Sequence, residues 1–304
     1  MLSESFKTSP YSYKKIIDNS SGKEREIMRP KFYPDQCIQW AVMQVIEPII
    51  SKGHYFYSCG SIPGKGVHFA KRYFRKWIRR HFRNTKYVLQ IDVTKYYPSI
   101  NHDKLKGMFR RKIKCQRTLN LINEIINGGG IGLPIGNYTS QWFANFYLQD
   151  FDRYLKQDLK IKYYVRYMDD IVIFGSNKRV LHRHRKTIDK ILDELKLTVK
   201  DNWQVFKFDS RPLDFLGYKF YRTHITIRKR NSLRIKRRAK KIFKKGYLNL
   251  KDASAMVSYM GWIKSSDSYY FYHKHIKPYV NIPKPLIRSV PPLKIFTIIM
   301  RKQA

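Results

Sequence analysis

The stretch YYVRYMDDIVIFG, residues 163–175, places two adjacent carboxylates, Asp169 and Asp170, between apolar segments. The stretch reads like a pair of buried strands, with Tyr163, Val165 and Tyr167 in the first and the apolar residues 171–174 in the second. This pattern predicts a β-hairpin with its turn at the two aspartates. An ionised carboxylate in an apolar setting costs several kcal/mol unless something compensates it, so the pair points to a special role.

A third carboxylate, Asp92, ends the alternating stretch KYVLQID, residues 86–92, which also predicts a strand. If this strand pairs with the hairpin, Asp92, Asp169 and Asp170 meet at one edge of a sheet. Clustered carboxylates are unfavourable unless cations lie between them, and Mg²⁺ binds one or two carboxylates together with phosphate oxygens. Two such ions about 4 Å apart activate an attacking hydroxyl and stabilise a leaving pyrophosphate, which is the chemistry of nucleotidyl transfer.

The two neighbouring carboxylates cannot share one role equally, because adjacent side chains of a strand point to opposite faces of the sheet. We expect Asp169 to bind metal together with Asp92, and Asp170 to lie further from the chemistry. An Asp-Asp pair is also an ordinary turn signal that needs no metal. The metal-binding interpretation therefore depends on Asp92 and on the charge of the rest of the chain.

The charge balance indicates a polyanionic partner. The 304 residues include 62 Lys and Arg against 22 Asp and Glu, a net charge of +40. No acidic residue lies between Glu47 and Asp92 or between Phe215 and Lys251, and aromatic residues are interspersed among the cations there. This combination favours nucleic acid as the partner. The basic stretches lack the long apolar face of an interfacial helix, so a membrane surface is disfavoured.

The chain shows no signal peptide or membrane span, and its three cysteines have neither zinc nor disulfide spacing, so we expect a cytoplasmic protein. Apolar periodicity predicts helices near residues 35–50, 67–82, 102–112, 116–126, 141–155 and 180–196. Further strands are expected within residues 197–208 and 213–229, followed by basic helices. The mixture predicts an α+β fold.

The stretches YMDD, residues 167–170, and DVTKYYPSI, residues 92–100, resemble the palm of a reverse transcriptase. SGKEREIMRP, DQCIQWAVMQVIEPI and FLGY resemble, in the expected order, the fingers strands, the fingers helix and the primer-grip hairpin of that family. The resemblance implies a right-hand polymerase fold with fingers, an antiparallel palm sheet that carries the YMDD hairpin, and a helical thumb. The implied bounds are 1–86 and 105–132 for the fingers, 87–104 and 133–222 for the palm, and 223–304 for the thumb and C-terminal tail.

The resemblance also implies a role for each matching position. The metal site would consist of the catalytic residues Asp92, Asp169 and Asp170 and the backbone carbonyl of Val93, and it would bind two Mg²⁺ ions, with Mn²⁺ as a substitute. The nucleotide-binding residues would be Lys23, Arg25, Tyr97, Ile135 and Gly136, and the primer grip would be Phe215, Leu216 and Gly217. Lys23 and Arg25 would neutralise the triphosphate, and Tyr97 would exclude a ribose 2′-OH. Solvated surface for the two cations and an ordinary core position for the tyrosine remain the alternatives.

The loop LPIGNYTSQWFAN, residues 133–145, indicates a subgroup. Many reverse transcriptases read Gln-Gly and then Ser-Pro there, whereas Ile135 replaces the Gln and Gln141 replaces the Pro. With SYMGWIKSSDSY, residues 258–269, the loop resembles diversity-generating retroelement enzymes, which copy a template RNA with errors at adenines and use a basic accessory protein. Anti-phage defence reverse transcriptases with a dedicated noncoding RNA share parts of it, so both subgroups stay open. Losing the Gln amide should weaken nucleotide discrimination.

The implied activity is RNA-directed DNA polymerisation, with template RNA, the cDNA or its primer, and dNTPs as partners. A non-catalytic RNA-binding protein is the alternative from another class, and it is disfavoured because unused clustered carboxylates are costly. In the family, a Lys after the helix that follows the hairpin is proposed to protonate pyrophosphate. The closest position here is Trp203, with Lys200 nearby, so that role stays open. The basic residues 228–245 would grip phosphates of the template–primer duplex.

Overall fold

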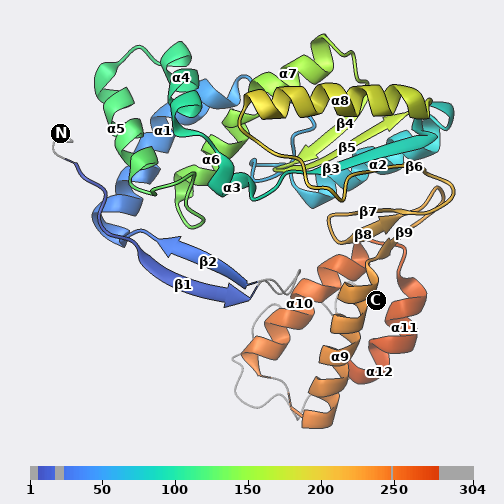
Figure 1. Cartoon of the computed structure of the whole chain (residues 1–304). Coiled ribbons are helices and arrows are strands. Elements are labelled where there is room, and N and C mark those ends of the chain that lie inside the picture. Colours follow the sequence, from blue (N-terminus) through green and yellow to red (C-terminus); the bar gives the residue numbers. More distant parts are fainter. Residues whose placement is uncertain (1–5, 18–23, 248, 281–304) are drawn as a thin grey trace. The chain divides into compact units, whose positions relative to one another are not determined.

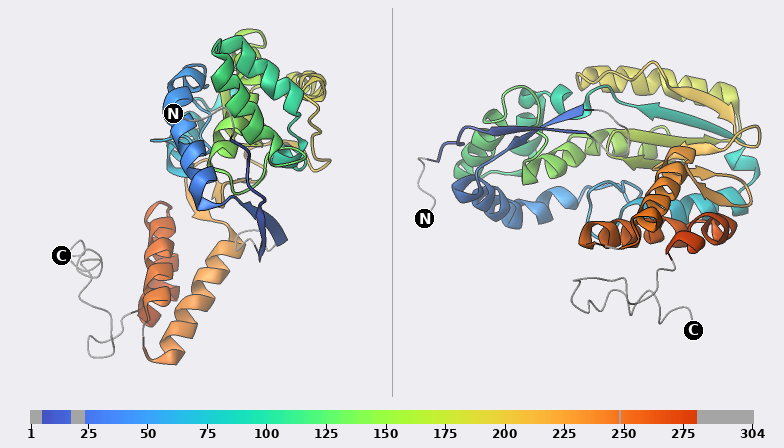
Figure 2. Two further views of the ribbon diagram at one scale, coloured as in Figure 1. Left: turned by 90° about the vertical axis from the view of Figure 1, so that its left-hand side faces the viewer. Right: turned by 90° about the horizontal axis from the view of Figure 1, so that it is seen from below.

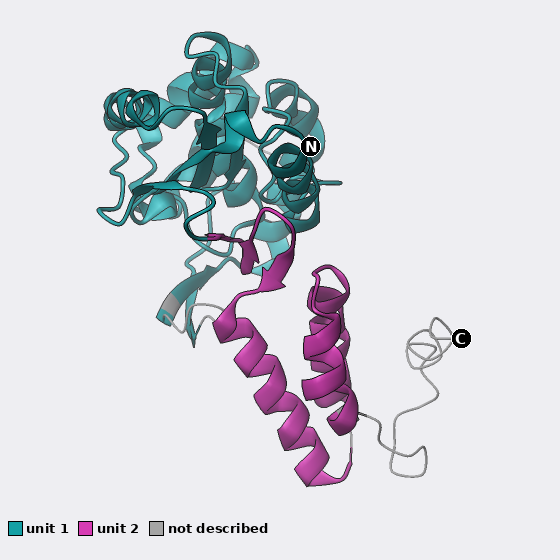
Figure 3. Cartoon of the chain, turned by 90° about the vertical axis from the view of Figure 1, so that its right-hand side faces the viewer, with its two compact units in different colours: residues 1–211 teal, residues 212–304 magenta. Residues whose placement is uncertain are grey.

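The computed structural model describes residues 6–17, 24–247 and 249–280. Its contacts divide the chain into two compact units, Met1–Arg211 and Pro212–Ala304 (Figure 3). Each unit has a sheet and helices of its own.

The first unit is built around a four-stranded antiparallel sheet in the order β4-β5-β3-β6 (Figure 1). Its strands are β3 (Tyr87–Asp92), β4 (Tyr163–Tyr167), β5 (Asp170–Gly175) and β6 (Gln204–Lys207). β4 and β5 form the expected hairpin, and β5 pairs along the whole of β3. The apolar hairpin therefore supplies two adjacent strands, and the strand that ends in Asp92 lies next to it.

One face of the sheet is buried at one end and open at the other. Phe174, Val172 and Asp170 share this face of β5, because alternate residues of a strand point the same way. Helix α2 (Val67–Arg80) covers the end at Phe174, where the ring centroid of Phe74 lies 5.4 Å from that of Phe174. Phe174 and Val172 are buried, whereas Asp170 is half-exposed. The open end is the one that carries the carboxylate.

The opposite face of the sheet lies in the main hydrophobic core. Ile171 and Ile173 of β5 are fully buried there. Helix α8 (Lys178–Glu194) packs Leu181 and Leu192 into the same core, which its amphipathic sequence predicts. This helix begins after Asn177, whose Oδ1 accepts a hydrogen bond from the backbone N–H of Arg179 at 2.8 Å.

This unit has eight further helical segments in the described residues, and six of them contribute side chains to the same core. They are η1 (Phe32–Gln36), α1 (Cys37–Ser51), η2 (Arg83–Thr85), α3 (Tyr96–Ser99), α4 (His102–Lys112), α5 (Gln116–Asn127), α6 (Tyr138–Tyr147) and α7 (Gln149–Gln157). A two-stranded ribbon of β1 (Ser12–Ile17) and β2 (Glu24–Arg29) lies at the same end of the unit as α1, α4 and α5 (Figures 1 and 2). Apart from the first residues of α4, these elements lie within the predicted fingers ranges 1–86 and 105–132, and their assignment to a fingers subdomain stays a prediction.

The second unit joins a small sheet to basic helices. Its elements are β7 (Leu213–Phe215), β8 (Tyr218–Phe220), β9 (Ile225–Ile227), α9 (Lys229–Lys245), α10 (Leu250–Lys264), α11 (Tyr269–His275) and α12 (Lys277–Val280). Asp252 of α10 pairs with two cations of α9, Arg238 at 2.5 Å and Lys245 at 3.2 Å. This carboxylate follows the acid-free stretch directly and holds the two helices together.

The expected α+β class is confirmed, because helices and antiparallel strands alternate irregularly and every ladder between strands is antiparallel within the described ranges. The finer subdomain bounds stay a prediction. None of the helices in the described part of the chain is long and apolar enough to cross a membrane.

Candidate active site

Two of the predicted carboxylates are direct neighbours across the sheet. Asp92, the last residue of β3, lies opposite Asp170, the first residue of β5, and Asp170 in turn lies opposite Tyr167 of β4. Directly opposed residues of an antiparallel pair have Cβ atoms about 5 Å apart on the same face. Asp92 and Asp170 therefore lie together at the open end of the sheet, where both are half-exposed.

The third carboxylate, Asp169, lies in the turn itself. The turn is formed by Met168 and Asp169, and Met168 has a left-handed backbone with φ of 54°. Strand alternation predicts that Asp169 and Asp170 point to opposite faces of the sheet. A turn residue does not follow strand alternation. The Asp169 side chain can therefore lie near Asp92 even though Asp169 is next to Asp170 in the sequence.

The electrostatics of Asp169 show that it lies close to Asp92. Burial first, and then the negative charge of Asp92, raise the pKa of Asp169 from 3.8 to about 6, against a lowering effect of Lys200. Two carboxylates that are held together and partly desolvated in this way repel each other unless a cation joins them. A cation bound between the Asp92 and Asp169 carboxylates would therefore relieve their repulsion.

The sequence left open which residue would protonate pyrophosphate, and Lys200 lies near the closest position, Trp203. After β3 the chain continues to pair with residues 198–200, since the Lys200 N–H donates to the Asp92 carbonyl at 2.8 Å. The Lys200 ammonium forms an ion pair with Asp92 Oδ2. Trp203 instead packs against α8, with the Arg185 guanidinium 4.6 Å from its ring centroid. Of the two positions, Lys200 rather than Trp203 contacts a predicted catalytic carboxylate, and the role of a proton donor stays a prediction.

The donor atoms at this edge fit a hard divalent cation. Asp92 Oδ1 is buried and has no hydrogen-bond partner, and the neighbouring Asp169 carboxylate is disfavoured as an anion in its present surroundings. Among the described residues, no group of three or more His, Cys, Asp or Glu side chains is arranged to hold a metal ion by itself. Mg²⁺ in nucleotide-handling sites takes one or two carboxylates and completes its shell with phosphate and water. The carbonyl of Val93 stays a predicted ligand.

Tyr97 lies on the short helix α3 beside the carboxylate strand. Its side chain is half-buried, with its ring centroid 5.8 Å from that of Tyr96. Tyr96 is buried and donates its hydroxyl to the carbonyl of Ala144 on α6 at 2.5 Å. The Leu133 N–H donates to the Tyr97 carbonyl at 2.9 Å. The tyrosine pair thus connects the end of β3 to the loop that contains Ile135, and the role of Tyr97 at the sugar stays a prediction.

Ile135 and Gly136 are held against the β1–β2 ribbon. The backbone N–H of Met28 donates to the Ile135 carbonyl at 2.9 Å. Gly136 has φ of 138°, and a Cβ there would lie 2.0 Å from the Met28 carbonyl oxygen. Only glycine fits such a position, because another residue would suffer both the backbone strain and the overlap. Main-chain contacts therefore fix the loop on β2.

The two predicted triphosphate cations are described unequally. Lys23 lies outside the described residues. Arg25 lies on β2 opposite Ile16, three residues before Met28. Met28 binds the Ile135 loop, so the strand of Arg25 runs beside that loop, and the role of Lys23 and Arg25 at a triphosphate stays a prediction.

The predicted primer-grip residues form the β7–β8 turn of the second unit. Phe215 is buried, Leu216 has φ of 50°, and a Cβ at Gly217 would lie 2.4 Å from the Trp262 ring. Tyr218 stacks on Trp262, with ring centroids 5.0 Å apart. The turn is thus packed tightly onto α10, and its contact with a primer stays a prediction.

The basic stretches form exposed helix faces. On α2 the exposed cations are Arg72, Arg75, Lys76, Arg79 and Arg80, while Ala70, Phe74, Trp77 and Ile78 are buried. On α9 cations likewise surround a narrow apolar stripe. Such faces suit a phosphate backbone.

An antiparallel sheet that ends in neighbouring carboxylates, with helices on its other face and the basic helix α2 over part of the open face, defines the palm of a nucleic-acid polymerase of the right-hand type. The family described as "Reverse transcriptase (RNA-dependent DNA polymerase)" matches residues 17–220. The match includes the hairpin, Asp92 and the Ile135 loop, and the chain belongs to this family.

Curated relatives agree with this assignment. The group II intron-encoded protein LtrA of Lactococcus lactis subsp. cremoris is 28% identical over 186 residues, which cover 56% of this chain and 30% of LtrA. An uncharacterized 91 kDa protein in a cob intron of Schizosaccharomyces pombe is 30% identical over 168 residues, covering 51% of this chain and 20% of that protein. The chain therefore spans less than half the length of these relatives.

Solved structures show the fold. An apo telomerase from Candida tropicalis, truncated from its C-terminal domain, superimposes with a TM-score of 0.56 at 15% identity, covering 72% of this chain and 56% of that one. Telomerase from Candida albicans in complex with a TWJ fragment of telomeric RNA gives a TM-score of 0.53 at 12% identity, covering 91% and 58%. The expected right-hand polymerase fold is thus confirmed.

Proposed function

We propose that the chain is an RNA-directed DNA polymerase that copies a template RNA into cDNA by nucleotidyl transfer. The observation that carries the proposal is the carboxylate pair Asp92 and Asp169 at the open end of the palm sheet. A buried Asp92 oxygen has no hydrogen-bond partner, and the pKa of Asp169 is raised by burial and by Asp92. A fold that served only to bind RNA would gain nothing from this repulsion.

Each group of the chain then has a role in the proposed reaction. Asp92 and Asp169 would hold two divalent cations, Mg²⁺ or in its place Mn²⁺, which when bound supply activation of the primer 3′-hydroxyl and charge neutralisation at the leaving pyrophosphate. Lys200 neutralises Asp92 from the side of residues 198–200. Tyr97 would limit the space at the sugar, and the basic faces of α2 and α9 would bind the backbones of template and cDNA.

For the biological setting, we propose error-prone copying in a diversity-generating retroelement, assisted by a basic accessory protein. The support is Ile135, which has no amide to hydrogen-bond the nascent base pair and which main-chain contacts to Met28 hold in place. A site without a positioned polar group discriminates weakly between similar substrates. An anti-phage defence enzyme with a dedicated noncoding RNA is the alternative.

Primer extension tests the activity. Purified protein is incubated with an RNA template, a DNA primer, dNTPs and Mg²⁺, with and without RNA co-purified from the cell. Wild type should extend the primer and Asp169→Asn should not, whereas Asp193→Asn, which changes an exposed carboxylate near the end of α8, should keep wild-type activity. Full activity of Asp169→Asn would overturn the site, and RNA binding without extension under every condition would favour the non-catalytic alternative.

The setting is tested by sequencing the cDNA bound to the protein in cells. Substitutions at template adenines, found again in a variable gene, support diversification. A repetitive product or a single fixed product supports defence.

A further inference from the structure

A buried arginine lies directly beneath the catalytic turn. Arg166, on β4, is fully buried, and it lies opposite Ile171, on the face of the sheet turned away from Asp170. Burying a guanidinium group is costly unless it is paired and fully hydrogen-bonded. Its position within the hairpin therefore requires partners on neighbouring elements.

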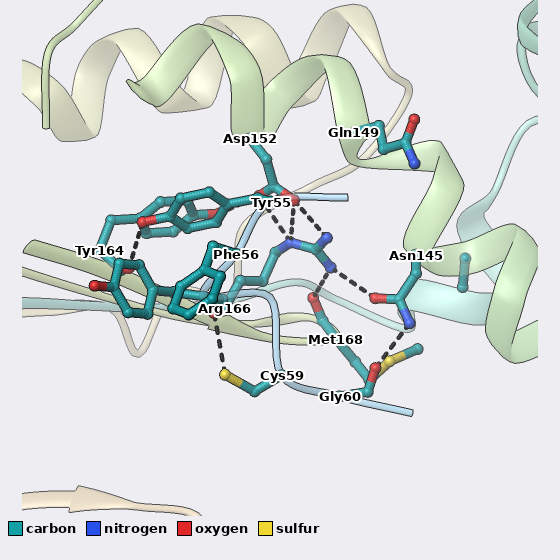
Figure 4. A network of polar contacts seen from close by, with 12 residues as sticks. Tyr55, Phe56, Cys59, Gly60, Asn145, Gln149, Asp152, Tyr164, Arg166 and Met168 are labelled. Carbon is teal, nitrogen blue, oxygen red and sulfur yellow. Dashed lines mark hydrogen bonds and ion pairs between the residues drawn. The ribbon is translucent and has the colours of Figure 1, made fainter. Parts of the chain in front are cut away.

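The first partner is Asp152 of α7, which is also fully buried. Arg166 Nη2 lies 2.6 Å from Asp152 Oδ2, and Arg166 Nε lies 2.9 Å from Oδ1, which gives a two-pronged ion pair (Figure 4). The Tyr164 hydroxyl donates to Asp152 Oδ1 at 2.5 Å. This side of the network fixes the guanidinium plane relative to α7.

The third nitrogen of the Arg166 guanidinium group, Nη1, contacts the turn. Arg166 Nη1 donates to the Met168 carbonyl at 3.0 Å and to Asn145 Oδ1 at 3.3 Å (Figure 4). Met168 is the left-handed residue immediately before Asp169. The hydrogen bond therefore holds the peptide group that leads into the metal-binding carboxylate.

A loop closes on the same turn from the edge of the sheet. Asn145 Nδ2 donates to the Gly60 carbonyl at 2.8 Å, and the Cys59 N–H donates to the Arg166 carbonyl at 2.8 Å. A Cβ at Gly60 would lie 2.8 Å from the Met168 backbone nitrogen, so the loop and the turn are in close contact. Asn145 thus joins the arginine to this loop, and Met168 is held from two directions.

We propose that Asp152, Arg166 and Asn145 are positioning residues that hold the Met168 turn so that the Asp169 carboxylate stays beside Asp92. A carboxylate next to a like charge moves away when its backbone is free to do so, and here the network restrains the backbone. The inference rests on the proposed polymerase function for its purpose, although the restraint itself exists without metal or substrate.

Two substitutions separate positioning from ordinary stability. Both variants leave the bond from Arg166 to Met168 intact. Asn145→Ala removes the acceptor beside that bond and the donor to the Gly60 carbonyl, whereas Tyr164→Phe removes one hydrogen bond on the far side of Asp152. We expect Asn145→Ala to lower kcat by about 10-fold or more with little change in the KM for dNTP, because small displacements of reacting groups are costly. Tyr164→Phe should stay within about 3-fold of wild type. Equal effects of the two variants, after correction for the fraction folded, would overturn the inference.

A second measurement needs no activity. The melting temperatures of wild type, Asn145→Ala, Asp169→Asn and the double variant are compared in EDTA, and the same cycle is run with Tyr164→Phe. Asp169→Asn removes the repulsion from Asp92, so it should raise the melting temperature, and the rise should shrink to half or less when Asn145 is truncated but not when Tyr164 is. If the changes in melting temperature are additive in both cycles, the proposal that Asn145 helps to hold the Asp169 turn is refuted.

The two experiments keep the inference separate from the proposed function. If wild type fails to polymerise, the proposed function fails while the melting cycle still decides whether the network restrains Asp169. If Asn145→Ala does not fold, Asn145→Ser replaces it in both assays.

Discussion

Asp169→Asn should make the protein more stable when no metal is bound. Burial and the charge of Asp92 raise the pKa of Asp169 from 3.8 to about 6. A rise of roughly 2 pKa units means that the folded state disfavours the ionised carboxylate by about 3 kcal/mol at neutral pH. Asn has nearly the same shape and no charge, so the substitution should remove most of this cost. In a domain of about 200 residues, the melting temperature should rise by roughly 6–12 °C.

The rise in melting temperature caused by Asp169→Asn should be larger at high pH than at low pH. A carboxyl group whose pKa is higher in the folded than in the unfolded protein destabilises the fold above both values. This cost decreases as the pH falls from about 6 to 3.8, and it is absent at lower pH, where both states are protonated. The difference between Asp169→Asn and wild type should therefore be largest above pH 7 and shrink towards pH 4.

The assay is thermal unfolding in EDTA, followed by circular dichroism at several pH values. Asp193→Asn is the matched control, because it removes an exposed carboxylate from the end of α8 and should change stability little. Equal melting temperatures of Asp169→Asn and wild type at neutral pH would refute the reasoning, and so would a gain that does not vary with pH. The same variant should be inactive in primer extension, so the residue would trade stability for activity.

Tyr97→Ala should admit ribonucleotides, because it removes bulk beside the predicted sugar site; misincorporation assays with rNTPs check this, and unchanged sugar selectivity would remove Tyr97 from that role. Ile135→Gln should lower the error rate by restoring a hydrogen-bonding group, and sequencing of the cDNA would contradict this if the error spectrum were unaltered. Gly60→Ala should destabilise the protein by roughly 1–3 kcal/mol, because its Cβ would overlap the backbone nitrogen of Met168, whereas Gly107→Ala in α4, where a Cβ meets nothing within 4 Å, should be neutral or stabilising in urea unfolding. RNA affinity should fall steeply as salt rises, by roughly 10³-fold between 50 and 200 mM for six or more phosphate contacts, and a flat response in filter binding would mean that the basic faces bind something else.

The sequence predicts the palm well because its signals are local. Alternation in residues 86–92 and 163–167 defines the strands, and the break at YMDD defines the hairpin turn. The position of Asp169 within that turn was less predictable, since a shift of one residue decides whether strand alternation applies. The repulsion between Asp169 and Asp92 follows only from the pairing of strands that lie far apart in the chain.

Contacts over long distances in the sequence could not be predicted in the same way. Lys200 pairs with Asp92 across 108 positions, whereas the sequence points to Trp203 as the closest match to the family's lysine, with Lys200 only nearby. Arg166 did leave a signal, because a charged residue in a strand whose other residues are apolar or aromatic requires a buried partner. The sequence alone does not show that this partner is Asp152, since several acidic residues are compatible with that need.

The attachment of residue 135 through its main chain has a practical consequence for altering the proposed polymerase activity. The Met28 N–H holds the Ile135 carbonyl, and Gly136 supplies the tight approach to β2, so the course of the loop does not depend on which side chain residue 135 carries. The Ile135 side chain is itself only half-buried. A panel of substitutions at residue 135 should therefore give a graded series of mutation rates on an unchanged backbone. Variants with a chosen mutation rate could then be selected for engineered mutagenesis.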